Sequence, residues 1–218
     1  EMCIRDRAMG IQVQAATVIL GSQNLVAVLG IVTAVGSMIS MALCPLLIKK
    51  LNERNAYILL SVYGFAASVF SFVIGHFWFQ SPKNMVLTVL FYASLFLIGL
   101  QFGAVTLMPM IMTADTVDYY EHETGKRMEG ACYSILTLTI KVCLALGTAV
   151  GLIFVQKSGY YESLSAGTFT TKTKDIIFFA YTALPGILAL LSIVPMFKYD
   201  IVGEKKAKIS SDLASRRK

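Results

Sequence analysis

Charged side chains are nearly absent from several long stretches of this sequence. Charged residues make up only 15% of the chain, hydrophobic residues make up 56%, and the mean hydropathy is +0.67. These values lie well outside the usual composition of a soluble domain. The scarcity of charge therefore indicates a membrane protein.

Five of the apolar stretches are long enough to cross a hydrocarbon core about 30 Å thick, which takes roughly 20 helical residues. They are residues 24–48, 56–79, 85–114, 130–156 and 176–197. A sixth stretch, residues 8–20, is too short to cross and is interpreted as the cut end of a helix. The sequence predicts an all-α transmembrane bundle over residues 8–198, followed by a basic tail at residues 199–218.

The first seven residues, EMCIRDR, lack the apolar core and the small-residue cleavage site of a signal peptide. They resemble the translation of a sequencing adapter, and a natural charged leader is the alternative. On the first interpretation the chain is a fragment whose natural sequence begins upstream of Ala8.

The sequence also lacks the motifs that enzymes and metal sites use. His76 and His122 lie far apart, and there is no HExxH or CxxC motif. We therefore expect no catalytic residue, no metal site and no cofactor. Cys132 and Cys143 lie about 16 Å apart along one predicted helix, too far for a disulfide, so free thiols are expected there and at Cys44.

Lysine and arginine are distributed unevenly between the two sides of the predicted bundle. The basic residues on one side are Lys49, Lys50, Arg54, Lys126, Arg127, Lys198, Lys205, Lys206, Lys208, Arg216, Arg217 and Lys218, and those on the other side are Lys83, Lys157, Lys172 and Lys174. Basic loops stay in the cytoplasm, so the first side and the carboxyl terminus are predicted to be cytoplasmic, in a cell membrane. The tail is interpreted as a solvated segment attracted to anionic lipid. No basic region with interleaved aromatic residues indicates a nucleic-acid partner.

Lys141 lies near the middle of the span at residues 130–156, where a charge costs several kcal/mol unless it is paired or faces water. Tyr133, Ser134 and Thr137 lie on or beside the same stripe of the helix. A snorkelling lysine is the structural alternative, but the cytoplasmic end is roughly 16 Å away, farther than the side chain extends. The other spans contain no carboxylate, so Lys141 is expected to face water or to pair with another part of the protein.

The preceding span carries two polar residues, Gln101 and Thr106, among apolar neighbours. Either is consistent with a hydrogen bond inside the bundle or with a place on a transport pathway. Gly99 and Gly103 are four residues apart and are expected to allow close approach of another helix.

The stretch DTVDYYEHETGKRMEG, residues 115–130, concentrates charge between two apolar spans. On a helix Asp115 and Asp118, with Glu121 as a further member, repel one another unless a cation neutralises them. Lys126 and Arg127 are the candidate cations, returned by a turn. The cluster is consistent with a clamp between two helix ends or with a solvated loop whose ion pairs contribute little.

The longer stretch MTADTVDYYEHETGKRMEGACYSILTLTIKVCLALG resembles the signature of the glycoside-pentoside-hexuronide:cation symporters, the melibiose-permease group of the major facilitator superfamily. The matching residues are Asp115, Asp118, Tyr119, Gly125, Arg127, Glu129, Ser134 and Lys141. Tyr120 departs from the pattern, since the family often has glycine there. The resemblance implies a twelve-helix transporter in two halves, with this chain as the carboxyl half.

The resemblance also implies cation-coupled sugar symport by alternating access, with sodium or a proton as the coupling ion. The candidate pathway residues are Lys141, Thr137, Ser134, Tyr133, Gln101 and Thr106, and the candidate cytoplasmic gate residues are Asp115, Asp118, Lys126, Arg127 and Glu129. The expected partners are a sugar or glycoside, the lipid bilayer and the missing amino-terminal half. Transport of another cargo, such as a lysolipid or drug, and a membrane-embedded enzyme are the alternatives.

Overall fold

The computed structural model describes residues 15, 17–18, 26–81 and 84–216, and these residues contain helices and no strand. The helices are α3 (Val26–Gln80), α4 (Met85–Thr124), α5 (Glu129–Lys157), α6 (Tyr160–Ser165), α7 (Thr171–Phe178), the π-helical turn η2 (Phe179–Ala183), α8 (Leu184–Leu191), α9 (Ile193–Met196) and α10 (Gly203–Arg216). The predicted all-α fold is confirmed. The leader at residues 1–7 and most of the predicted short stretch at residues 8–20 lie outside the described residues.

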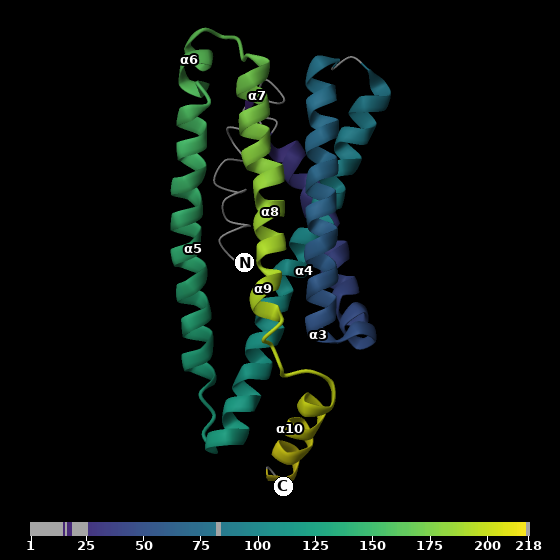
Figure 1. The fold of residues 1–218 in the computed structure, drawn as a ribbon, viewed down its shortest axis with the longest axis vertical. Coiled ribbons are helices and arrows are strands. Elements are labelled where there is room, and N and C mark those ends of the chain that lie inside the picture. The colour runs from purple at the N-terminus through teal and green to yellow at the C-terminus, as the bar shows by residue number, and fades with distance from the viewer. Residues whose placement is uncertain (1–14, 16, 19–25, 82–83, 217–218) are drawn as a thin grey trace.

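Helix α3 is two helices joined by a sharp turn. Asn52 has φ 62° and ψ 162°, which no residue inside an α-helix adopts. We call residues 26–51 the first leg of α3 and residues 53–80 the second leg. Both legs pack against α4 (Figure 1).

The predicted spans fall on these helices. Residues 24–48 and 56–79 correspond to the two legs, residues 130–156 lie within α5, and residues 176–197 cover most of the run from α7 to α9. Among the described residues, four continuous helical segments are long and apolar enough to cross a membrane, the first of them holding both legs.

Helix α4 continues well beyond the apolar stretch at residues 85–114. Asn84 caps its first turn by accepting a hydrogen bond from the Val86 N–H, and the helix runs through the charged stretch to Thr124. It ends at Gly125, whose φ of 68° closes the last turn with an N–H bond to the Glu121 carbonyl. The charged residues at 115–124 are therefore held on a rigid helix end.

Two glycines of α4 make the expected close contact with another helix. A Cβ at Gly99 would clash with the Thr33 carbonyl oxygen, and one at Gly103 would clash with the Ser37 carbonyl oxygen. The first leg of α3 thus lies directly against α4, which confirms the packing interpretation of this glycine pair.

An aromatic cluster holds together the end of α3, the start of α4 and the end of α7. Trp78 stacks on Phe91 with ring centroids 4.7 Å apart, and its indole N–H donates to the Thr88 hydroxyl at 3.0 Å. Phe178 joins them from α7. Many large apolar side chains elsewhere remain exposed, Ile31, Leu138 and Val194 among them, as expected for helices that face lipid.

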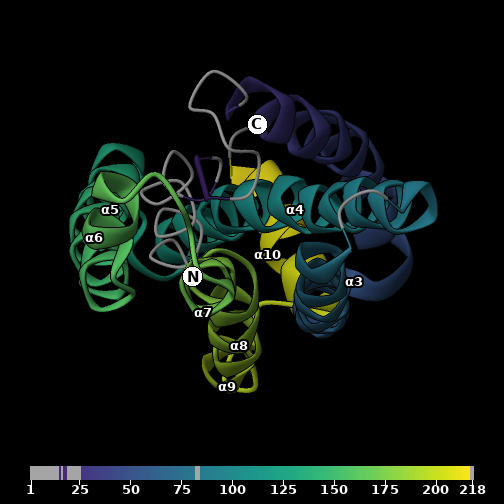
Figure 2. The same ribbon diagram turned by 90° about the horizontal axis from the view of Figure 1, so that it is seen from above.

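Helix α5 stands to one side of the bundle (Figures 1 and 2). Its only buried described residues are Gly147, Gly151 and Val155. Most of this long apolar helix is therefore uncovered by the described part of the chain.

Two expectations are corrected. The tail is not simply solvated, because residues 203–216 form α10, which packs on α4 and buries Ile209 and Leu213. Cys44 and Cys132 are free thiols, but Cys143 is disulfide-bonded. The spacing of Cys132 and Cys143 along one helix excludes only a bond between these two residues.

Candidate transport site and charged helix ends

Lys141 and the polar residues predicted with it share one face of α5. Tyr133, Ser134, Thr137 and Lys141 line one open groove of about 430 Å³, together with Gly130 and Leu138. Ser134, Thr137 and Lys141 are three and four residues apart and so lie on successive turns of one side, with Tyr133 next to Ser134. The structure therefore brings four of the six predicted pathway residues together.

The ammonium group of Lys141 is exposed on this face and forms no ion pair with any residue that the structure describes. In a helix that crosses a membrane, an uncompensated lysine costs several kcal/mol. Hydroxyls of Tyr133, Ser134 and Thr137 accompany it in the groove. A cation beside hydroxyl donors and acceptors can bind polar, oxygen-rich ligands or a carboxylate from another helix.

Tyr133 also connects the groove to α4. Its hydroxyl donates to the Met110 carbonyl oxygen at 3.4 Å, next to Pro109. Proline lacks an N–H and so removes one helical hydrogen bond, which weakens α4 at this level. The Thr113 hydroxyl donates to the Pro109 carbonyl at 2.7 Å, one turn farther along the helix.

Gln101 does not line the Lys141 groove. It is buried between α4 and the second leg of α3, where its amide lies so close to Gly64 that a Cβ there would overlap it. It borders a cavity of about 20 Å³ with Tyr181 and Thr182. Such a cavity has room for a water molecule and no sugar.

Thr106 is likewise separate from the groove. Its hydroxyl donates to the Phe102 carbonyl of its own helix at 2.6 Å. A hydrogen bond inside the bundle was one of the two possibilities left open for Gln101 and Thr106. Thr106 makes such a bond.

Arg127 joins the end of α4 to the start of α5. Its guanidinium nitrogens lie 3.0 Å from Glu121, 3.0 Å from Glu129 and 3.5 Å from Asp118. The hydrogen bonds that Arg127 donates to Glu129 and Glu121 raise the pKa of its guanidinium above the usual value. Lys126, predicted beside it, makes no ion pair with the described residues, whereas Arg127 contacts all three carboxylates.

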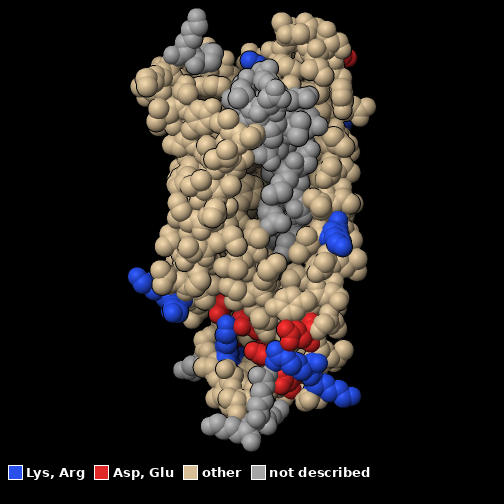
Figure 3. All heavy atoms as spheres, turned by 180° about the vertical axis from the view of Figure 1, so that it is seen from behind, with Lys and Arg blue, Asp and Glu red and all other residues tan. Residues whose placement is uncertain are grey.

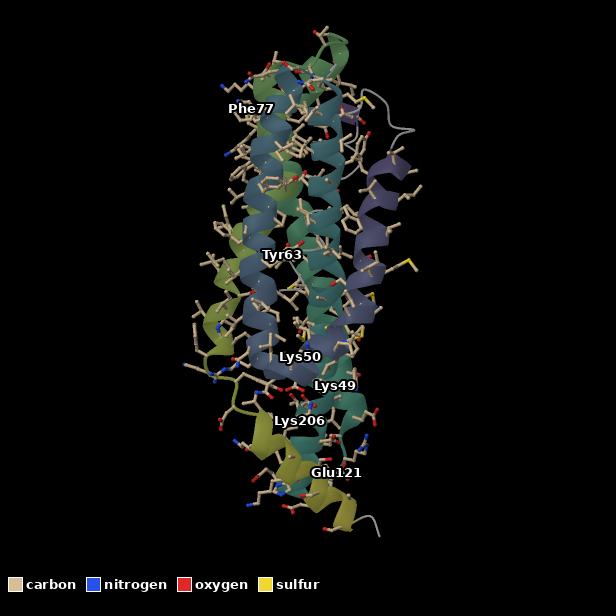
Figure 4. All side chains as sticks on the ribbon, turned by 90° about the vertical axis from the view of Figure 1, so that its right-hand side faces the viewer. Lys49, Lys50, Tyr63, Phe77, Glu121 and Lys206 are labelled. Carbon is tan, nitrogen blue, oxygen red and sulfur yellow. The ribbon has the colours of Figure 1, made fainter. Side chains whose placement is uncertain are left out.

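Asp115 has a partner that the sequence analysis did not expect. It is buried and lies 2.8 Å from Nζ of Lys206 on α10, while the same Nζ lies 2.6 Å from the buried Glu53 at the turn of α3. Burial lowers the pKa of Lys206, but hydrogen bonds and attraction from Asp115 and Glu53 outweigh it and raise that pKa overall. Lys206 therefore joins α3, α4 and the tail (Figure 4).

Further contacts hold α10 in place. His122 Nε2 lies 3.2 Å from the Asp212 carboxylate. Lys205 bonds Asp200 at 2.7 Å, and its ammonium lies 5.5 Å from the Tyr119 ring centroid. Acidic and basic side chains gather at this one end of the molecule (Figure 3).

The sites of Glu53 and Lys206 in an ion-pair network and the helix α10 were not predicted from the sequence. Ile209 and Leu213, four residues apart in a polar segment, are the helical signal that was available. No local pattern identifies Lys206 as the partner of Asp115, because 91 positions separate them.

The profile of a family described as MFS/sugar transport protein matches residues 15–203, which is most of the chain. The chain belongs to this family. It is therefore a multi-pass membrane protein of a transporter family and not an enzyme.

The curated relatives agree with the symporter resemblance. The chain is 28% identical to the "Inner membrane symporter YicJ" of Escherichia coli (strain K12) over 91% of this chain and 40% of that protein. It is 24% identical to the "Glucuronide carrier protein homolog" of the same organism, over 92% of this chain and 41% of that protein. The chain thus spans about two fifths of the length of these relatives. No solved structure matches it significantly.

Proposed function

We propose that this chain is the carboxyl-terminal half of a cation-coupled sugar symporter that works by alternating access. The observation that carries the proposal is the polar groove of Lys141, Tyr133, Ser134 and Thr137 on an apolar helix. A membrane-spanning helix retains such a costly stripe where it faces water, substrate or a charged partner.

The exposed face of α5 supports a partner that covers it. Lys141 lies on that face and pairs with no described carboxylate. An amino-terminal half with intramembrane carboxylates would supply both the covering surface and the counter-charge. Sugar bound between two halves at this level fits the midplane sites of such transporters.

Two groups of ion pairs, which we call charged joints, lie at the opposite end from the aromatic cluster. They support a role for this end in the conformational change of the transporter. Arg127 ties α4 to α5, and Lys206 ties α10 to α3 and α4. These joints link the ends of α3, α4, α5 and α10 that we place in the cytoplasm, so these ends would move together. Sodium or a proton that binds one conformation more tightly than another would drive the change. The concentration of Lys and Arg at this end supports a cytoplasmic carboxyl terminus.

The decisive experiment replaces Lys141 in the whole transporter that this proposal requires. Lys141→Leu should abolish sugar accumulation in vesicles under a sodium or proton gradient, while membrane insertion stays normal. Lys157→Gln, at the outer end of the same helix, is the matched control and should transport normally. Equal accumulation by the Lys141→Leu variant and the control would remove Lys141 from the pathway.

A binding measurement tests the cargo separately. Radiolabelled glycosides should bind the whole transporter and compete with one another, and Lys141→Leu should weaken that binding. Lysolipid binding that glycosides do not displace would show the scaffold serving a different cargo.

A further inference from the structure

The two legs of α3 diverge over α4 and leave an apolar groove of about 670 Å³ between them. The first leg contributes Leu43, Leu47 and Lys50, the second leg contributes Leu59 and Tyr63, and α4 contributes Leu100. Its volume lies within the roughly 300–1,000 Å³ typical of small-molecule sites. This groove is separate from the Lys141 groove, with which it shares no lining residue.

The groove is preformed and open to its surroundings. The Tyr63 hydroxyl donates to the Leu97 carbonyl at 3.1 Å and fixes the second leg to α4. Leu43 and Leu59 on its two walls are 53% and 49% exposed. In a bilayer these walls face hydrocarbon chains, so the groove offers a fixed slot to an acyl chain.

The length of the groove matches one leaflet. Its lining along the first leg runs from Ser40 to Lys50, a rise of roughly 15 Å at 1.5 Å per residue. Half of a hydrocarbon core about 30 Å thick has the same depth. An acyl chain lying between the legs would therefore bring its headgroup to the level of Lys50.

The charged residues at the end of the groove indicate which lipid headgroup would bind there. Lys50 is part of the lining and Lys49 precedes it, and neither forms an ion pair with a described residue. The nearby carboxylates of Glu53 and Asp115 are already bound by Lys206. Figure 4 shows Tyr63 farther up the molecule than Lys50 and Lys49, which lie near the charged end.

We propose that this groove binds an anionic phospholipid, with one acyl chain between the legs of α3 and the phosphate at Lys50. No acidic residue lines the groove to offset the lysine charge. A zwitterionic lipid would bring its own cation beside Lys49 and Lys50, so an anionic headgroup binds better. Basic sites between membrane helices at the cytoplasmic side suit such headgroups.

The test measures lipid retained by the purified chain in a mild detergent, using native mass spectrometry. Phosphatidylglycerol is compared with phosphatidylcholine of the same acyl chains. Lys50→Gln removes the headgroup contact, and Lys198→Gln is its control, since Lys198 lies near the same end but outside the groove. Leu59→Trp fills the slot, and Leu152→Trp on α5 is its control.

We expect the chain to retain phosphatidylglycerol more strongly than phosphatidylcholine. Lys50→Gln should weaken phosphatidylglycerol about fivefold, the effect of one interfacial basic residue, while Lys198→Gln should bind as the unmodified chain does. Leu59→Trp should lower retention of both lipids, and Leu152→Trp should not.

Equal binding of the two lipids, or equal affinity of Lys50→Gln and Lys198→Gln, would overturn the proposal. A dimer that Leu59→Trp abolishes and that excludes lipid would assign the groove to a second copy of the chain. Lys50 is an exposed lysine that forms no ion pair with the residues that the structure describes, so the Lys50→Gln comparison remains decisive even where Leu59→Trp does not fold. None of these outcomes depends on sugar transport.

Discussion

Nζ of Lys206 lies 2.8 Å from Oδ1 of Asp115 and thereby fastens the tail helix α10 to α4. Glu53 lies on the same ammonium at 2.6 Å, so one cation satisfies two buried carboxylates from different helices. Removing one partner of such an arrangement leaves the other charges buried without compensation.

Lys206→Met should therefore release α10. The expected loss is about 2 kcal/mol of docking free energy, less than for a fully buried pair because solvent reaches Lys206. Amide hydrogen exchange across residues 203–216 should accelerate roughly 30-fold. Lys208→Met, an exposed lysine on the same helix, should leave that exchange unchanged. Protection that survives Lys206→Met would show that Ile209 and Leu213 suffice to dock the helix.

Docking of α10 should weaken at alkaline pH. The pKa of Lys206 is raised in the folded chain, and burial, with the charges of Asp115 and Glu53, raises the pKa of Tyr199. A raised pKa means that stability is complete below the unfolded pKa and is lost as pH rises through the folded pKa. For both groups this window begins above about pH 10.

Pulsed electron paramagnetic resonance between spin labels on α10 and α4 can follow this transition. The distance should be constant through neutral pH and should lengthen in the alkaline window. Lys206→Met, already released, should show no such change. A transition of the same size in that variant would assign the alkaline effect to other groups.

Arg127→Gln should loosen the connection between α4 and α5. The change removes the contacts with Glu121, Glu129 and Asp118, and leaves a cluster of carboxylates that repel one another. Amide exchange over residues 119–130 should speed up severalfold, with less effect at high salt because screening already weakens exposed ion pairs. Lys126→Gln, next in sequence and without an ion pair among the described residues, is the matched control. Identical exchange in both variants would mean that Gly125 and the turn alone set this connection.

Several features were predictable from the sequence because they depend on neighbours along the chain. Uncharged stretches of sufficient length predicted the transmembrane helices, and helical periodicity predicted that Tyr133, Ser134 and Thr137 share a face with Lys141. The glycine spacing predicted a close helix contact, which Gly99 and Gly103 make with the first leg of α3.

The sequence by itself thus determined which segments are helical and apolar, and which face of α5 is polar. Only the tertiary structure decided that Asp115 pairs with Lys206, that Gln101 turns into the bundle toward Gly64, and that the legs of α3 enclose a groove ending at Lys50. The physical reason is that helix periodicity is local, whereas these contacts depend on the angles and depths at which separate helices pack.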